Sequence, residues 1–205
     1  MTIKFIDAVK NHKDLEHQNR AWEFLQASVH KELLDEFARI YRNEKVEPTL
    51  EVIPEAGIKL IKEFEGCHLK AYYDPLTGGL PITIGWGSTR RKDGSRFMIG
   101  NIITQEEADD LLYFQLRREF FLPALQKIPY WNEMNENQQG ALLSFSYNLG
   151  AGFYGSPNFN TITRVLKEKK WSEVPKALEL YRNPGTNVEK GLLRRRKAEG
   201  KLWIS

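Results

Sequence analysis

Apolar residues recur at three- and four-residue intervals along much of the chain, which predicts a mostly helical protein. The stripes cover about residues 19–42, 54–65, 104–121, 135–149, 172–181 and the stretch after 185. One segment differs, because Leu69, Ala71 and Tyr73 alternate with Lys70 and Tyr72. Alternation predicts a strand, and Gly78-Gly79 then provides a turn for a hairpin. We therefore expect an α+β fold that is predominantly helical.

Several element boundaries have their own local signals. Pro54 suits the start of one helix and Gly66 its end. Capping boxes are predicted for Thr104 with Glu107 and for Asn135 with Gln138. Two weaker signals predict a second hairpin with a type I′ turn at Asp93-Gly94 and an N-cap at Ser172.

Glu65, Asp74 and Thr83 lie where the first of these helices meets the hairpin. Glu65 ends the helix beside Phe64, and both the helix dipole and apolar neighbours disfavour an ionised carboxylate there, as suits a general acid. Asp74 ends the strand beside solvent, and Thr83 adds a hydroxyl. Glycosidases divide the work between two such carboxyl groups. Spacing alone favours a plain helix end and turn over a catalytic site, because such pairs are common.

A resemblance adds to this reading. In order along the chain, residues 60–66, 69–74 and 83–89 resemble the signature of phage-type lysozymes, which are bacteriophage muramidases of glycoside hydrolase family 24. The likeness covers about residues 54–205 and continues through 103–108, 144–150 and 191–199.

The resemblance implies a lysozyme-like fold, with a small β-hairpin lobe and a larger helical lobe around a cleft. It implies Glu65 as general acid, Asp74 as the carboxylate that activates water, and Thr83 as its helper. The reaction implied is cleavage of the β-1,4 bond between N-acetylmuramic acid and N-acetylglucosamine, with inversion and without cofactor or metal. Ser88 departs from the pattern, because many relatives have histidine there, and the loop of residues 76–81 is longer than in the shortest relatives.

Three further residues are candidates for substrate binding: Trp86, Asn148 and Arg195. Trp86 suits either stacking on a sugar ring or core packing. Asn148 suits either an N-acetyl contact or a hydrogen bond to its own helix. Arg194, Arg195 and Arg196 cannot share one helix face, so we expect Arg194 or Arg195 to approach Glu65, where it would favour the ionised form. The alternative is three solvated arginines, with Arg196 bridging Glu199.

The chain is expected to divide into a helical N-terminal extension, residues 1–50, and a catalytic domain, residues 51–205. The extension is interpreted either as a stripe docked on the catalytic domain or as a separate module that binds the wall or a partner. Two prolines and three acidic residues between positions 43 and 54 are typical of a linker.

Charge and composition restrict the partners. The formal net charge is +3, yet residues 161–205 alone carry 12 basic and 5 acidic side chains. Nucleic acid and the polyanionic bacterial wall would both attract this segment. Cys67 is the only cysteine, so no intramolecular disulfide can form. His12, His17 and His30 do not have metal-ligand spacing.

The N-terminus lacks the apolar core of a secretory signal, and no apolar run is long enough to span a membrane. We therefore expect a monomer that stays in the host cytoplasm until a holin releases it to peptidoglycan, or one carried in a virion. Three other functions stay open: a lytic transglycosylase, a wall-binding protein without activity, and a nucleic-acid binder.

Overall fold

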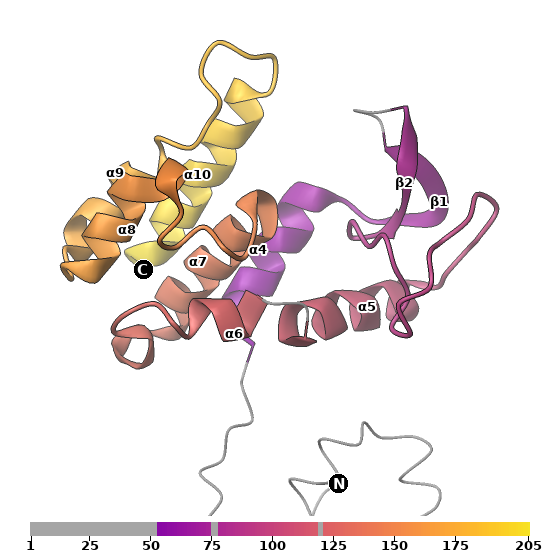
Figure 1. Ribbon diagram of the computed structural model, residues 1–205, viewed down its shortest axis with the longest axis horizontal. Coiled ribbons are helices and arrows are strands. Elements are labelled where there is room, and N and C mark those ends of the chain that lie inside the picture. The colour runs from indigo at the N-terminus through magenta and orange to yellow at the C-terminus, as the bar shows by residue number, and fades with distance from the viewer. Residues whose placement is uncertain (1–52, 75–77, 119–120) are drawn as a thin grey trace, which may run out of the picture. The chain divides into compact units, whose positions relative to one another are not determined.

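The computed structural model describes residues 53–74, 78–118 and 121–205 (Figure 1). The helices expected between residues 19 and 42, and the role of residues 1–50, lie outside this part and stay predictions. None of the helices in the described ranges is long and apolar enough to cross a membrane.

Helices make up most of the described chain, as the apolar periodicity predicts. They are α4 (Glu55–Glu65), α5 (Gln105–Arg118), α6 (Phe121–Leu125), α7 (Glu136–Leu149), α8 (Asn160–Lys167), α9 (Val174–Leu178) and α10 (Glu189–Trp203). Short 3-10 turns cover Trp131–Glu133, Pro157–Phe159 and Trp171–Glu173. Strands β1 (His68–Asp74) and β2 (Gly79–Gly85) form an antiparallel pair, so the α+β class is confirmed.

Local capping signals set two of the helix starts. Asn135 and Gln138 form a complete capping box at α7. Thr104 and Glu107 do the same before α5, with backbone-to-side-chain distances of 2.7 and 3.1 Å. The predicted cap at Ser172 is wrong, because α9 begins at Val174 with Pro175 in its first turn and has no side-chain cap.

The segment after β2 also differs from the prediction. A bridge joins Arg90 and Arg96, but no strand forms, and the amide of Arg91 donates to the carbonyl of Ser95 at 2.8 Å. Only Gly94 of the Asp93-Gly94 pair has a positive φ, of 84°, whereas a type I′ turn needs two such residues. The turn is thus a three-residue loop that ends in a left-handed glycine.

Two hydrophobic clusters both include residues of α5. The smaller cluster packs under the hairpin and includes Ile84, Phe97 and Leu111. The larger includes Leu112 and the inner faces of α4, α7, α8, α9 and α10. Neighbouring leucines of α5 thus contribute to different cores, and α5 connects the small lobe to the large one.

Helices α4 and α7 approach each other unusually closely. A Cβ atom on Gly57 would lie 2.7 Å from the Cα of Gly140, and one on Gly140 would lie 2.6 Å from the amide nitrogen of Gly57. Such a close crossing requires glycine at both positions. Because Glu65 is the last residue of α4, the crossing helps to fix where its carboxyl group lies relative to α7.

Candidate active site

Glu65 ends α4 immediately before the hairpin begins. Gly66 follows with φ 70° and ψ 151°, a conformation that glycine tolerates and that stops the helix. The Glu65 side chain is 25% exposed, so solvent reaches it although it lies at the edge of the large lobe.

Arg195 of α10 is the arginine that contacts Glu65. Its Nη1 lies 2.5 Å from Oε1 of Glu65, although the two residues are 130 positions apart. Arg194 is exposed and lies with its guanidinium 5.0 Å from the ring centre of Phe64. Arg196 is fully buried and does not contact Glu65 directly.

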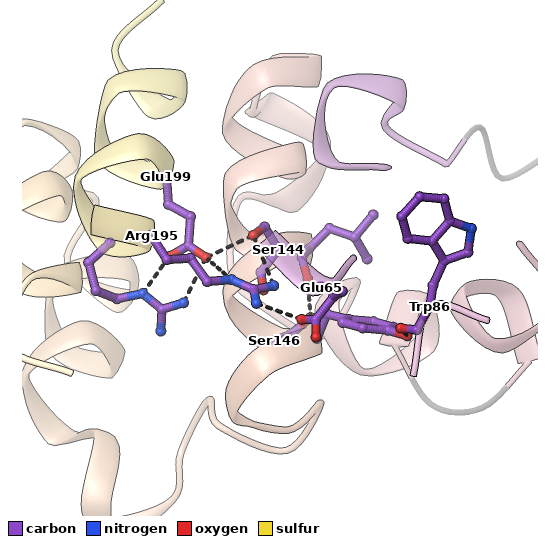
Figure 2. A network of polar contacts seen from close by, with 9 residues as sticks. Glu65, Trp86, Ser144, Ser146, Arg195 and Glu199 are labelled. Atoms are coloured by element: carbon purple, nitrogen blue, oxygen red, sulfur yellow. Dashed lines mark hydrogen bonds and ion pairs between the residues drawn. The ribbon is translucent and has the colours of Figure 1, made fainter. Parts of the chain in front are cut away.

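The Arg195 guanidinium is held on its remaining sides by α7 and α10 (Figure 2). Its Nη2 donates to the carbonyl oxygen of Ser144 at 3.1 Å, and its Nε donates to Oε1 of Glu199 at 3.3 Å. The Ser144 hydroxyl donates to the same Glu199 oxygen at 2.8 Å. Arg195 is 4% exposed, so these contacts, rather than water, satisfy its donors.

Glu199 and Arg196 complete the buried cluster behind Arg195. Nη2 of Arg196 donates to Oε1 of Glu199 at 2.8 Å, and Nε lies 2.7 Å from Oε2. Burial raises the pKa of Glu199, and the charges of Arg196 and Arg195 and the Ser144 hydrogen bond oppose this rise. Arginine keeps its proton in proteins, so Arg196 stays positively charged beside Glu199.

The hairpin places the other two predicted catalytic residues. Asp74 ends β1 and pairs with Gly79, while Thr83 of β2 lies opposite Tyr72. The Thr83 hydroxyl is 3.5 Å from the carbonyl oxygen of Pro81, a weak hydrogen bond that leaves it available. The side chain of Asp74 lies outside the described part of the chain, so its distance to Glu65 stays a prediction.

Trp86 connects the two lobes. Its indole Nε1 donates to Oδ1 of Asp109 at 2.7 Å, Nζ of Lys62 lies 5.3 Å from the ring centre, and its carbonyl accepts from the Tyr147 hydroxyl at 2.8 Å. The ring is partly buried against both hydrophobic clusters. One ring face and the N–H are thus used by the protein itself.

Ser88 lies where many of the lysozymes that this sequence resembles have histidine. The Ser88 side chain is fully buried, and its hydroxyl donates to Oε1 of Gln115 at 3.1 Å. In this chain the position joins the β2 loop to α5.

Asn148 lies near the C-terminal end of α7. Its Oδ1 is buried and has no hydrogen-bond partner among the described residues. The alternative prediction, a hydrogen bond to its own helix, would use the amide nitrogen, because the last turn of a helix leaves carbonyl groups free, and it stays a prediction. An acceptor without a partner is suited to bind a donor from a ligand.

Cys67 has no features of a nucleophile. Burial raises the pKa of its thiol above the ordinary value, although a hydrogen bond with Gln105 opposes this, so the thiol form dominates at neutral pH. The adjacent His68 packs its ring against Tyr72, with centres 4.7 Å apart. Within the described ranges, no cluster of three histidine, cysteine, aspartate or glutamate side chains could hold a metal ion.

Sequence reasoning missed Ser144 and Asp109, and it paired Glu199 with Arg196 only among solvated arginines, whereas this pair, 2.7 Å apart, is fully buried. The i,i+4 spacing of Arg195 and Glu199 gave a signal, but the same pattern is common on solvated helix faces. Their burial becomes visible only when α10 packs on α7. Asp109 gave no signal, since its partners Lys62, Trp86 and Gln105 are spread over 43 positions.

Comparisons with known proteins agree with this arrangement. The family model for phage lysozyme matches residues 62–199. An endolysin of Lactococcus phage c2 is 34% identical over 155 residues, which cover 74% of this chain and 59% of the relative. The chain thus matches little more than half of that relative's length.

Two solved structures are similar in fold. A variant of the lysozyme of phage P22 is 34% identical with a TM-score of 0.58, and the match covers 73% of this chain and 95% of the other. An endolysin from Escherichia coli O157:H7 phage FAHEc1 is 27% identical with a TM-score of 0.62, over 75% of this chain and 93% of the other. The lysozyme-like fold expected from the resemblance is confirmed.

Proposed function

The chain belongs to the phage lysozyme family, and from that premise we propose that it hydrolyses the glycan strands of bacterial peptidoglycan. The bond cleaved is the β-1,4 linkage between N-acetylmuramic acid and N-acetylglucosamine. The observation that carries the proposal is the place of Glu65, a partly exposed carboxyl group at the junction of helix and hairpin that Arg195 contacts from behind.

Glu65 and Asp74 have separate roles in the proposed reaction. Glu65 gives its proton to the glycosidic oxygen as the bond from that oxygen to the anomeric carbon breaks. Asp74 accepts a proton from the water whose oxygen bonds to the anomeric carbon from the opposite face, and Thr83 helps to position that water. Inversion requires carboxyl groups about 6.5–9.5 Å apart, with room for the water between them.

Two residues are proposed to contact sugar directly. The Asn148 side chain is partly exposed, and its amide group is of the type that binds an N-acetyl group. Trp86 is partly exposed and offers its remaining surface to a pyranose ring. Arg195 was predicted to bind substrate, but it is buried and its donors face Glu65, Ser144 and Glu199, so we infer that it acts through Glu65.

The proposal extends to partners and location. The enzyme acts as a monomer, needs no metal or cofactor, and does not use nucleic acid as substrate. It accumulates in the host cytoplasm and reaches peptidoglycan when a holin permeabilises the membrane, as an endolysin does. Carriage in the virion is the alternative route to the same substrate.

Glu65→Gln tests the proposal. The variant should fold but no longer clear a suspension of purified cell walls, while Glu63→Gln, an exposed change on the same helix, should clear it normally. Normal clearing by Glu65→Gln would contradict the central claim.

Mass spectrometry of the products separates the alternatives. Hydrolysis leaves reducing muramic acid ends, whereas a lytic transglycosylase leaves anhydro-muramic ends. A protein that sediments with walls yet releases no reducing sugar would be a binder only. Retention on heparin without any effect on walls would indicate a nucleic-acid binder.

A further inference from the structure

We propose that Glu199 is a positioning residue which, together with Ser144, holds Arg195 against the carboxyl group of Glu65. The inference rests on the proposed function, since it concerns the surroundings of the proposed general acid. Neither Glu199 nor Ser144 would touch substrate, because both side chains are fully buried.

The first argument is that Arg195 has little freedom to move. Glu199 binds its Nε at 3.3 Å and the carbonyl of Ser144 binds its Nη2 at 3.1 Å, which leaves Nη1 for Glu65 (Figure 2). A guanidinium is planar and its donors have a fixed geometry, so two anchored nitrogens determine where the third points. Glu199 and the Ser144 carbonyl thus determine the direction in which Nη1 points.

The second argument is that one oxygen of Glu199 organises three donors. Oε1 accepts from the Ser144 hydroxyl at 2.8 Å, from Arg195, and from Nη2 of Arg196 at 2.8 Å. Arg196 in turn lies with its guanidinium 4.7 Å from the ring centre of Phe145. Glu199 therefore connects Arg195, the arginine that contacts Glu65, to Arg196 and the buried ring of Phe145.

The third argument concerns charge. The described charged groups in contact here are Glu65 from α4 and Arg195, Arg196 and Glu199 from α10, so two carboxyl groups face two guanidinium groups. From α7 the facing polar groups are the hydroxyl and carbonyl of Ser144. Glu199 contacts both guanidinium groups, so Arg195 is not the only cation that faces it and can also pair with Glu65.

Stability alone does not require such a cluster. Buried ion pairs can often be replaced by apolar side chains of similar size without loss of stability. The double variant Arg196→Met/Glu199→Met makes this replacement, removes no net charge, and releases Nε of Arg195. The double variant therefore separates the contribution of the Arg196–Glu199 pair to stability from its restraint of the Arg195 side chain.

We expect the double variant to fold, with kcat for wall fragments lowered about tenfold and KM changed by less than about twofold. The NMR signal of the Arg195 Nε–H group, assigned with Arg195→Lys, should show a lower order parameter and faster exchange with water. Arg182→Met/Glu189→Met removes a similar arginine–glutamate pair, 3.1 Å apart, that does not contact Glu65, and should leave both readouts unchanged.

A double variant that folds with normal kcat and an unchanged Arg195 signal would overturn the proposal. If the double variant does not fold, Ser144→Ala tests the proposal, because it removes only one hydroxyl from the cluster. We expect Ser144→Ala to lower kcat less than the double variant does and to change the Arg195 signal in the same way. The NMR readout needs no hydrolysis, so it tests the positioning even if the chain proves inactive on peptidoglycan.

Discussion

The indole nitrogen of Trp86 lies 2.7 Å from a carboxylate oxygen of Asp109, and this hydrogen bond joins the loop after β2 to α5. The same oxygen also binds Nζ of Lys62 at 2.9 Å and the amide of Gln105 at 3.0 Å. Asp109 therefore connects α4, the small lobe and α5 close to Glu65. Its removal should loosen the junction at which the proposed catalytic residues meet.

Asp109→Asn should lower the free energy of unfolding by about 1 kcal/mol at pH 7, since Lys62 loses its partner at a site that is one-third exposed. Burial raises the pKa of Asp109, but hydrogen bonds with Lys62, Trp86 and Gln105 together hold it below its usual range. A carboxylate with a lowered pKa stabilises the folded state above its unfolded pKa and loses that effect on acidification. Urea titrations should therefore show that the difference in free energy of unfolding between the wild-type protein and Asp109→Asn becomes smaller as the pH falls below about 3.9.

Asp110→Asn is the matched control for this prediction. Asp110 pairs with Lys92, but its side chain is 60% exposed. Exposed ion pairs contribute little, so this change should cost less than about 0.5 kcal/mol. Equal effects of the two substitutions would show that the Asp109 cluster does not hold the junction.

Local signals explain which parts of the fold could be predicted from the sequence. Both capping boxes, the glycine stop after Glu65 and the alternation of β1 involve residues a few positions apart, and each was predicted correctly. The two errors, Ser172 and the turn at Asp93-Gly94, also involved local signals. At Ser172, the helix instead begins at Val174 with Pro175 in its first turn. At Asp93-Gly94, only Gly94 has the left-handed conformation.

The surroundings of Glu65 depend on tertiary contacts and could be predicted only in outline. Helix geometry required Arg194, Arg195 and Arg196 to point in different directions, but which one meets Glu65 depends on how α10 packs on α4 and α7. The close pair Gly57 and Gly140 gave no signal, because a glycine in a helix reveals nothing of its partner 83 positions away.

Asn148→Ala should raise KM for wall fragments several-fold with little change in stability. The reason is that Oδ1 of Asn148 makes no hydrogen bond within the described structure, so its loss costs no bond of that oxygen in the free protein. The variant would instead lose the hydrogen bond that this oxygen accepts from an N–H group of the substrate. Steady-state kinetics and urea titration measure the two effects separately.

Asn137→Ala is the control for Asn148→Ala. Asn137 lies on the same helix as Asn148, and its amide nitrogen donates to the Ser205 hydroxyl at 3.1 Å. This control variant should leave KM unchanged. An unchanged KM in Asn148→Ala as well would exclude Asn148 from the substrate site.

Residues 51–205 alone should clear cell walls as the full chain does. The match to the family model, residues 62–199, lies entirely inside this segment. A turbidity assay that compares the two proteins on purified walls measures the contribution of residues 1–50. Lost clearing with a folded truncated protein would instead make these residues part of the active enzyme.

Gly140→Ala should destabilise the protein and lower activity together. The new Cβ would lie 2.6 Å from the amide nitrogen of Gly57 and 3.1 Å from its Cα, and neither backbone atom can move unless α4 shifts. Overpacking of this kind costs about 1–3 kcal/mol, whereas helix propensity alone predicts a gain of about 1 kcal/mol for alanine. The sign of the change in the free energy of unfolding therefore separates the two effects, and a shift of α4 should also lower kcat by moving Glu65.

Gly191→Ala in α10 is the matched control for Gly140→Ala, because apart from its chain neighbours and its own helix backbone no atom lies within 4 Å of the position of its new Cβ. It should leave activity unchanged and either preserve stability or raise it by up to about 1 kcal/mol. If Gly140→Ala stabilised the protein as Gly191→Ala does, the two helices could not be as close as the glycine contact requires. Loss of stability in Gly140→Ala with normal kcat would mean that the position of Glu65 does not depend on this crossing.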